Sequence, residues 1–232
     1  MDSSRLLRIL GALRAAGGML RASGLCQSSV QIIGVAGASI TLIASRTGPE
    51  PLCSSGTLAS LAAELQHTLG EGPTFDAHRD GVPSLEPDIA NPRRPRWPAL
   101  GAAAEAEGIA ALFAFPLRIG AARLGALTLH QLRSGPLSAE QHLDALVLAD
   151  VIVNSILDMQ GRGAGRALGA DLEMLAAHRA EVHQASGMLS AQLGVSVMEA
   201  MVRLRAHAFA HGRPLADVAA DVVSGRLRLP SE

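Results

Sequence analysis

The chain has 232 residues, of which 48% are hydrophobic and 18% charged, so most of it is expected to fold rather than to remain disordered. Its formal net charge of −1 lacks the basic excess typical of nucleic-acid-binding domains, so any such function must depend on a local pattern of residues. The length suits one large domain, or a domain of about 150 residues followed by a smaller one.

The N-terminal segment from Ser4 to Ala22 has leucines at three- and four-residue steps, which predicts an amphipathic helix. Arginines interrupt its apolar positions, so it lacks the core of a signal peptide, and no run of about 20 apolar residues follows it. We therefore expect a cytoplasmic protein without a membrane segment. Since that compartment is reducing, Cys26 and Cys53 are interpreted as small core residues rather than as a disulfide pair.

Two short apolar runs follow, "SVQIIGVA" and "SITLIAS", whose β-branched residues predict adjacent strands. The segment "TLASLAAELQHTLG" returns to helical spacing and ends at Gly70. From Gly72 to Pro98 the chain is rich in proline, which lacks the N–H group that helices and sheets use. A long loop with short turns is therefore predicted there.

A short helix from Ala99 to Ala106 is predicted next, and "ALFAFPLRIG" with "ARLGALTLHQL" indicates a β-hairpin that turns near Gly120. Alternation places Phe113 and Phe115 on one face of this hairpin. The segment "LSAEQHLDALVLADVIVNSILDM" then has the length and spacing of a long helix, with Ser138 as its N-cap. These elements predict a mixed α+β domain of the sensor type.

The C-terminal part of the chain is predicted to be a separate helical unit. Residues 161–170 contain four glycines, and each lowers helix propensity by about 1 kcal/mol relative to alanine, so they predict a linker. Residues 171–229 then show three helical segments. Gly194 and Gly212 end the first two segments, and Ser196 begins a capping box at the start of the second.

Within that unit, "QASGMLSAQLGVSVMEAMVRLRAHA" followed by "RPLADVAADVV" resembles the ANTAR domain, a three-helix RNA-binding module of bacterial transcription antiterminators. The matching residues span all three helices without a gap: Ala185, Gly187, Leu189, Gly194, Ala200, Leu204, Arg205, Ala208, Leu215, Val218 and Ala219. The resemblance implies that the unit binds paired hairpin loops in leader RNA, where unpaired bases are accessible.

The segments "ELQHTLGEGPTFDA", "RWPAL", "FAFPLRIG" and "RLGALTLH" are similar to the GAF domains that precede ANTAR modules in actinobacterial proteins. The implied fold is α+β, with a GAF-like sheet and flanking helices in residues 1–160 and a three-helix ANTAR bundle in residues 171–229. The GAF domain is expected to sense a small molecule or a partner. Its first and last helices, Ser4–Ala22 and Ser138–Met159, are expected to pack across a two-fold axis in a homodimer.

The family pattern usually has a lysine where Ser186 stands and often an aromatic residue where His207 stands, two positions expected to contact RNA. Binding here is therefore expected to depend on the arginines, if they share one exposed face with His207. The predicted RNA-binding residues are Ser186, Gly187, Arg203, Arg205, His207 and Arg213. In the alternative interpretation these are solvated surface groups, and the chain is a dimeric interaction protein whose ANTAR unit has lost RNA binding.

For the N-terminal unit, a small-molecule pocket is hypothesised between Trp97, Phe113 and Phe115, three of the few aromatic residues of the chain. Ordinary core packing of the three side chains is the alternative. No cysteine, histidine or carboxylate cluster has metal-ligand spacing, and no catalytic nucleophile is recognisable. We therefore expect neither a metal site nor an enzyme, and the sequence indicates no particular cofactor.

Overall fold

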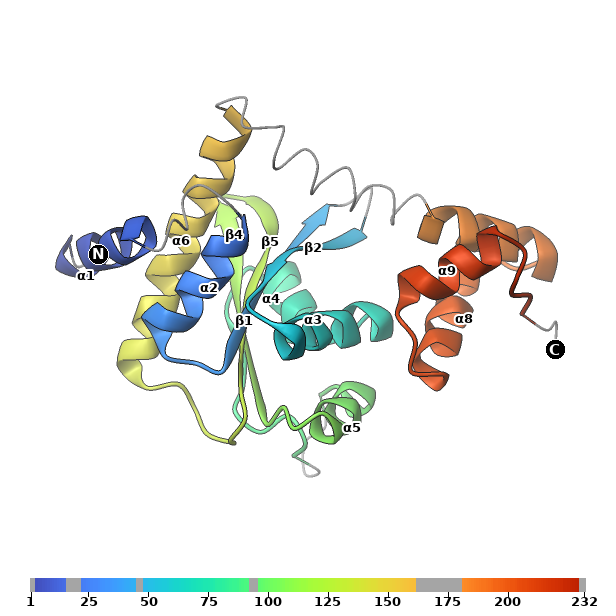
Figure 1. Cartoon of the computed structure of the whole chain (residues 1–232), viewed down its shortest axis with the longest axis horizontal. Coiled ribbons are helices and arrows are strands. Elements are labelled where there is room, and N and C mark those ends of the chain that lie inside the picture. Colours follow the sequence, from blue (N-terminus) through green and yellow to red (C-terminus); the bar gives the residue numbers. More distant parts are fainter. Residues whose placement is uncertain (1–2, 16–21, 45–47, 92–95, 162–180, 230–232) are drawn as a thin grey trace. The chain divides into compact units, whose positions relative to one another are not determined.

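The computed structural model describes residues 3–15, 22–44, 48–91, 96–161 and 181–229 (Figure 1). The chain divides into two compact units, Met1–Asp171 and Leu172–Glu232. Beyond Gly161, the predicted Gly-rich linker lies outside the described residues, and so does the start of the first predicted helix of the C-terminal unit.

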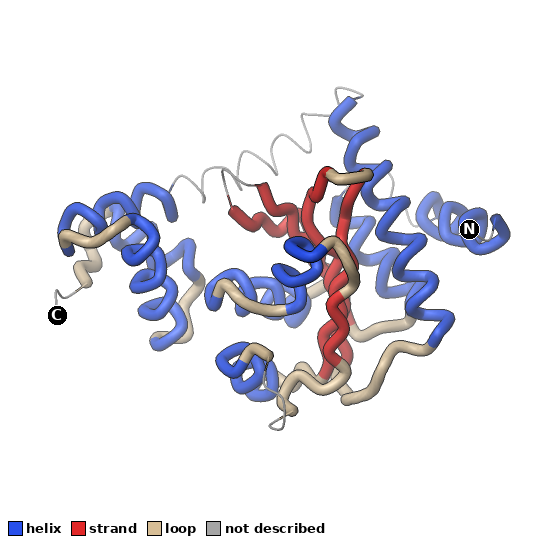
Figure 2. Tube along the Cα trace, turned by 180° about the vertical axis from the view of Figure 1, so that it is seen from behind, coloured by secondary structure: helices blue, strands red, loops and turns tan. Residues whose placement is uncertain are grey.

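The N-terminal unit is built on an antiparallel sheet whose five described strands lie in the order β2-β1-β5-β4-β3 (Figures 1 and 2). The strands are β1 (Gly37–Ala44), β2 (Gly48–Ser54), β3 (Ser84–Glu86), β4 (Ala111–Ile119) and β5 (Ala122–Gln131). Strands β4 and β5 are the predicted hairpin, and Gly120 between them has a φ of +56°, which favours glycine.

Helices cover both faces of this sheet. On one face lie α2 (Ala22–Ile33) and α6 (Ala139–Gly161), and α1 (Ser3–Ala15) packs against them. On the other face lie α3 (Thr57–Leu69) and α4 (Pro73–Asp80), with α5 (Pro98–Ala106) packed on α3. This arrangement confirms the predicted α+β class, with a sheet and flanking helices in the N-terminal unit.

The strand predicted for "SVQIIGVA" is wrong, because its residues up to Ile33 belong to helix α2. Most buried residues of this helix lie on one helical face: Ala22, Leu25, Cys26, Ser29 and Ile33, with Ser28 buried beside them. Burial of one helical face therefore outweighs the β propensity of the short apolar run. The helix predicted for Ser4–Ala22 corresponds to α1, residues 16–21 lie outside the described part of the chain, and Ala22 begins α2.

Proline-containing segments hold elements that the sequence did not predict. Strand β2 includes Pro49 and Pro51, which a sheet tolerates because β2 is an edge strand. The long loop predicted from Gly72 to Pro98 instead contains α4 and β3. Pro73 occupies the first turn of α4, where the missing N–H group would have no partner within the helix anyway.

Cys26 and Cys53 form a disulfide bond, which corrects their interpretation as unpaired core residues. Cys26 lies on the buried face of α2, Cys53 lies on β2, and α2 packs across β1 and β2. The two Cα atoms are 6.1 Å apart, a distance that a disulfide can span. The pairing therefore depends on α2 being a helix that lies over this edge of the sheet.

Helix α6 is held by polar contacts at its start and along its length. Ser138 caps it as predicted, since its hydroxyl accepts a hydrogen bond from the Gln141 N–H at 3.1 Å. Further along, the buried carboxylate of Asp144 accepts hydrogen bonds from Arg8 Nη2 at 2.6 and 2.7 Å and from Arg5. The bond to Asp144 raises the pKa of Arg8. Two charged contacts therefore tie α1 to α6.

Buried His130 is expected to make the N-terminal unit less stable in acid. Gly37 packs so closely on its ring that a Cβ there would lie 2.1 Å from His130 Cε1. Burial lowers the pKa of His130, so the folded state binds the proton more weakly than the unfolded chain. The contribution to the free energy of unfolding is therefore complete above about pH 6.5 and is lost as the pH falls through the lowered pKa.

Urea midpoints of the unchanged protein and of His130→Gln, measured between about pH 7.5 and 5, test this expectation. The variant removes one buried titrating group, so its midpoint should fall less with acidification. Equal declines in the two proteins would show that His130 does not contribute.

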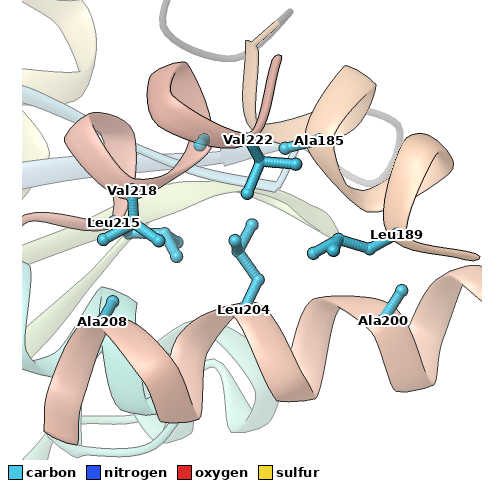
Figure 3. Packing of buried hydrophobic residues seen from close by; sticks show 9 residues of the cluster. Ala185, Leu189, Ala200, Leu204, Ala208, Leu215, Val218 and Val222 are labelled. Atoms are coloured by element: carbon cyan, nitrogen blue, oxygen red, sulfur yellow. The ribbon is translucent and has the colours of Figure 1, made fainter. Parts of the chain in front are cut away.

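The C-terminal unit is a bundle of three described helices: residues 181–193, α8 (Val197–Ala210) and α9 (Leu215–Val223). Small and branched side chains from all three form its core: Ala185, Leu189, Ala200, Leu204, Ala208, Leu215, Val218, Ala219 and Val222 (Figure 3). The predicted capping box is present, because Ser196 Oγ accepts a hydrogen bond from the Glu199 N–H at 3.1 Å. The predicted three-helix bundle is thus confirmed over these residues.

Candidate nucleic-acid interface

The first helix of the bundle turns Ser186 inward and Gly187 outward. Ser186 is fully buried, and its hydroxyl donates a hydrogen bond to the Val182 carbonyl at 2.7 Å and lies 3.7 Å from Met201 Sδ of α8. Gly187 is exposed, with open space where a Cβ would point. Ser186 therefore supports the contact between two helices, and Gly187 is the member of this predicted pair that faces solvent.

Two of the predicted arginines lie on different sides of α8. Arg203 forms an ion pair with Glu199 one turn earlier, at 2.9 Å. Arg205 is two residues further along the helix, a separation that turns its side chain about 200° away from that of Arg203. The Arg205 Nε atom is buried without a hydrogen-bond partner in the described part of the chain, and burial lowers the pKa of its guanidinium group. The structure therefore does not place Arg203 and Arg205 on one face.

His207 stacks on His211, the residue one turn later. Their ring centroids are 4.0 Å apart with an interplanar angle of 25°, and His211 Nδ1 lies 2.8 Å from the His207 carbonyl oxygen. Burial lowers the pKa of His207, and the nearby charges of His211 and Arg213 lower it further. His207 is therefore more readily neutral than an isolated histidine would be, and the two stacked rings form a flat surface.

Arg213 lies in the joint between α8 and α9 and is engaged by an acidic residue. Its Nη2 atom contacts Asp221 Oδ2 at 2.7 Å, and Arg226 Nε contacts Asp221 Oδ1, also at 2.7 Å. These two hydrogen bonds lower the pKa of Asp221, so its carboxylate remains charged and continues to hold both arginines. Part of the positive charge at this joint is therefore neutralised within the bundle.

Four residues nevertheless lie close together in the structure and are called the basic edge: Arg203, His207, His211 and Arg213. Arg203 and His207 lie one turn apart on α8, His211 is the C-cap one turn later, and Arg213 is near enough to His207 to influence its pKa. His211 is not among the predicted site residues, although its spacing from His207 would have indicated it. Glu199 and Asp221 limit the net charge of this edge.

The three aromatic residues of the hypothesised pocket lie on two faces of the sheet. The Phe115 ring is 5.4 Å from the ring of His142 on α6, and Phe113 shares its face by alternation along β4. Trp97 instead packs with Leu112, on the face that carries α3 and α5. All three side chains are buried, so they contribute to two separate parts of the core.

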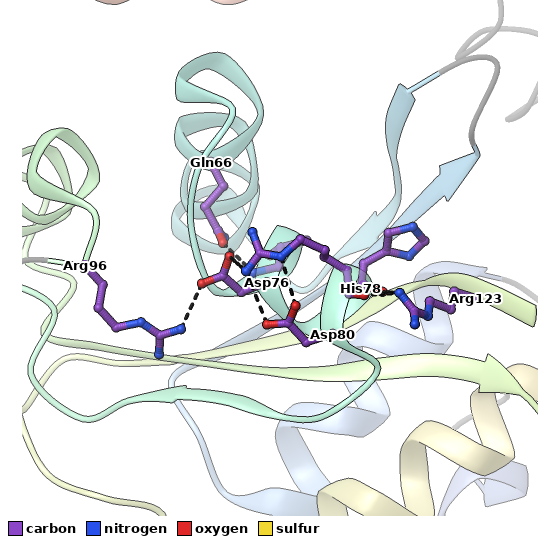
Figure 4. A network of polar contacts seen from close by, with 8 residues as sticks. Gln66, Asp76, His78, Asp80, Arg96 and Arg123 are labelled. Carbon is purple, nitrogen blue, oxygen red and sulfur yellow. Dashed lines mark hydrogen bonds and ion pairs between the residues drawn. The ribbon is translucent and has the colours of Figure 1, made fainter. Parts of the chain in front are cut away.

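A polar network occupies the sheet face beneath α4 (Figure 4). Gln66 Oε1 accepts a hydrogen bond from the Thr74 N–H at 2.9 Å, and the Thr74 and Thr128 hydroxyls are 2.7 Å apart. Asp76 pairs with Arg79 at 2.8 Å and with Arg96 at 2.9 Å. Exposed Arg79 and half-exposed Arg96 thus pair with a buried carboxylate, while the buried Gln66, Thr74 and Thr128 bond to one another, so the network positions α4 and the segment around Arg96.

An open pocket of about 330 Å³ lies on the opposite side of the sheet, beside α6. Its lining includes Leu6, Arg118, Ile119, Val147, Asp150 and Asn154.

The described residues contain no cluster of three or more histidine, cysteine, aspartate or glutamate side chains that could hold a metal ion. Among the described helices, none has both the length and the apolar character needed to cross a membrane.

The described residues thus form an antiparallel sheet covered by helices on both faces and, further along the chain, a small helical bundle. Residues 170–223 match the family model of the ANTAR domain. The helix of residues 181–193, α8 and α9 all fall within that range. The chain therefore contains an ANTAR domain at its C-terminal end.

The N-terminal unit has the fold of a GAF domain. It is similar to the GAF domain of a phosphoenolpyruvate-protein phosphotransferase from Acinetobacter, with 13% identity and a TM-score of 0.53 over 71% of this chain and 99% of that one. The corresponding GAF domain from Coxiella burnetii matches with 16% identity and a TM-score of 0.49, over 68% and 98% of the two chains. No curated protein sequence matches the chain.

Proposed function

We propose that this chain is a regulator of transcription antitermination that binds hairpin loops of leader RNA through its ANTAR domain. The observation that carries the proposal is the match over residues 170–223, together with a complete hydrophobic core in the described part of that domain. By holding one RNA hairpin, the protein would disfavour a competing terminator. This role requires no catalytic step, and it places the protein in the cytoplasm with the transcript.

Within this proposal the basic edge contacts RNA phosphates. Arg203 and Arg213 are partly exposed, and each can exchange its carboxylate partner for a phosphate, which a guanidinium group also binds in a bidentate manner. The stacked pair of His207 and His211 adds a flat surface beside them. Exposed Gly187 leaves room for close approach of an RNA backbone.

Replacing two of these arginines should weaken RNA binding and make it less sensitive to salt. The double substitution Arg203→Gln and Arg213→Gln removes two phosphate contacts, each worth about 0.7 in the slope of log K against log salt for a single-stranded loop. Filter binding of leader RNAs from the source genome measures both the affinity and this slope. The control is Arg133→Gln, which removes an exposed arginine from the N-terminal unit. Equal losses in both proteins would contradict the assignment.

The GAF domain is proposed to sense a small molecule or a partner and to form a homodimer. Large apolar side chains remain exposed on α1 and α6, namely Leu7, Leu143 and Leu157. Such residues are available for a two-fold contact between copies, which would bring two ANTAR domains to a pair of RNA loops. Sedimentation of the full chain at micromolar concentration should show a dimer, and a monomer would contradict this part of the proposal.

A second candidate function is that of a dimeric interaction protein whose ANTAR domain no longer binds RNA. The ion pairs of Arg203 with Glu199 and of Arg213 with Asp221 favour this alternative, because they neutralise charge that RNA binding would use. The same filter-binding assay decides between the two. Retention of leader RNA that decreases with salt supports the regulator, and its absence supports the interaction protein.

A further inference from the structure

The outer face of α8 carries an apolar stripe that the bundle leaves uncovered. Met198, Val202 and Phe209 are 79%, 57% and 40% exposed. Together with Arg205 they are spaced four, three and four residues apart, which places all four on one side of the helix. The buried residues Ala200, Leu204 and Ala208 occupy the side that faces the core. We call the four exposed and half-exposed residues the α8 stripe.

Arg205 lies in the middle of the α8 stripe and differs from the other arginine of this helix. Arg203 has Glu199 as its partner, whereas the buried Nε of Arg205 has no hydrogen-bond partner among the residues that the structure describes. A charged donor without an acceptor is costly to keep partly buried. The stripe therefore contains a half-buried guanidinium group whose Nε–H lacks an acceptor among the described residues, between exposed apolar side chains.

The chemistry of the stripe fits an unpaired RNA base with its phosphate. Phe209 is an exposed aromatic ring one turn from the guanidinium plane of Arg205, and bases stack on both kinds of group. The phosphate or a base oxygen of the same nucleotide supplies the acceptor that Arg205 lacks. A protein partner would bury the apolar residues equally well, but it would need a carboxylate placed at Arg205, whereas every nucleotide carries an acceptor.

We propose that the α8 stripe is the surface on which the ANTAR domain of this chain stacks an unpaired loop base, with Phe209 as the platform and Arg205 as the donor. The proposal rests on RNA binding, the function proposed above. It assigns base contact to the side of α8 opposite the basic edge. Met198 and Val202 pack against the sugar and the edge of the same base.

The test uses the full chain and a leader hairpin retained in the filter assay, with 2-aminopurine replacing each loop purine in turn. Stacking changes the fluorescence of this base analogue, so the signal reports contact with the base itself. Phe209→Ala should abolish the fluorescence change at one loop position and weaken binding about five- to hundredfold. Phe209→Trp should restore both. The control is Val197→Ala, which removes exposed apolar surface from α8 outside the stripe.

Each outcome decides the proposal. Unchanged affinity and fluorescence in Phe209→Ala, while the unchanged protein binds RNA, would overturn the stacking site and leave the proposed function intact. No RNA binding by the unchanged protein would overturn both. If Phe209→Ala instead alters sedimentation of the protein without altering RNA affinity, the stripe is a protein interface and the proposal is wrong.

Discussion

Leu204→Ala is expected to unfold the ANTAR bundle while the GAF domain remains folded. Leu204 is fully buried and, in Figure 3, points from α8 toward Val222 of α9. Truncating a buried leucine costs about 2 to 5 kcal/mol, because transfer energy is lost and a cavity remains. A unit of this size has a free energy of unfolding of only about 3 to 9 kcal/mol, so the truncation removes a large part of its stability.

The single tryptophan of the chain makes this result easy to assign. Trp97 is buried in the GAF domain, so its fluorescence follows unfolding of that domain, whereas circular dichroism follows the helices of both units. Leu204→Ala should lower the helical signal and leave the Trp97 transition unchanged. Val202→Ala is the control on the same helix; it is exposed and should shift stability by about 0.5 kcal/mol or less. An unchanged helical transition in Leu204→Ala would contradict the described core.

Reduction of the Cys26–Cys53 disulfide is expected to destabilise the GAF domain by about 3.5 kcal/mol, from the loop-closure entropy of a bond between residues 27 apart in sequence. The bond links residues of α2 and β2, and so it limits the conformational freedom of the segment between them in the unfolded chain. Trp97 fluorescence in urea, with and without dithiothreitol, measures the change.

The control for this prediction is the double substitution Cys26→Ala and Cys53→Ala. That variant should already have the lower stability, and dithiothreitol should not alter it further. Thiol titration of the unfolded, unreduced protein gives a second check. Two free thiols in each chain would show that the bond does not form in solution.

The ANTAR bundle could be predicted from the sequence because its determinants are local. Ser196 caps α8, glycines with positive φ end both the first helix and α8, and the apolar periodicity gives the core positions. The direction of Ser186 could not be predicted in this way. Whether a helical serine faces a neighbouring helix or solvent depends on how the helices pack, and here it contacts Met201 of α8.

In the GAF domain, the elements predicted from sequence are wrong where long-range packing decides the structure. The β-branched residues before Gly34 favour a strand, but their helix buries one face against the sheet. Pro49 and Pro51 argue against a strand in the sequence, and β2 tolerates them because it lies at the edge of the sheet. The Cys26–Cys53 pairing requires both of these elements, and so it could not be found until they were placed.

The candidate RNA site was partly accessible from the sequence. Residues i and i+2 of a helix point about 200° apart, so the separation of Arg203 and Arg205 follows from their numbering alone. The ion pair of Arg203 with Glu199 follows from four-residue spacing in the same way. Asp221, in contrast, reaches Arg213 across the joint between two helices, and only the fold brings these residues together.

Selection of RNA from a lysate of the source organism by the full-length protein tests the central claim most directly. The unchanged protein should enrich leader transcripts whose paired hairpins expose unpaired loops, and high salt should release them. The Leu204→Ala variant, which lacks a folded ANTAR bundle, should not enrich them. If both proteins recover the same RNA, or neither recovers any, the chain does not bind RNA through its ANTAR domain.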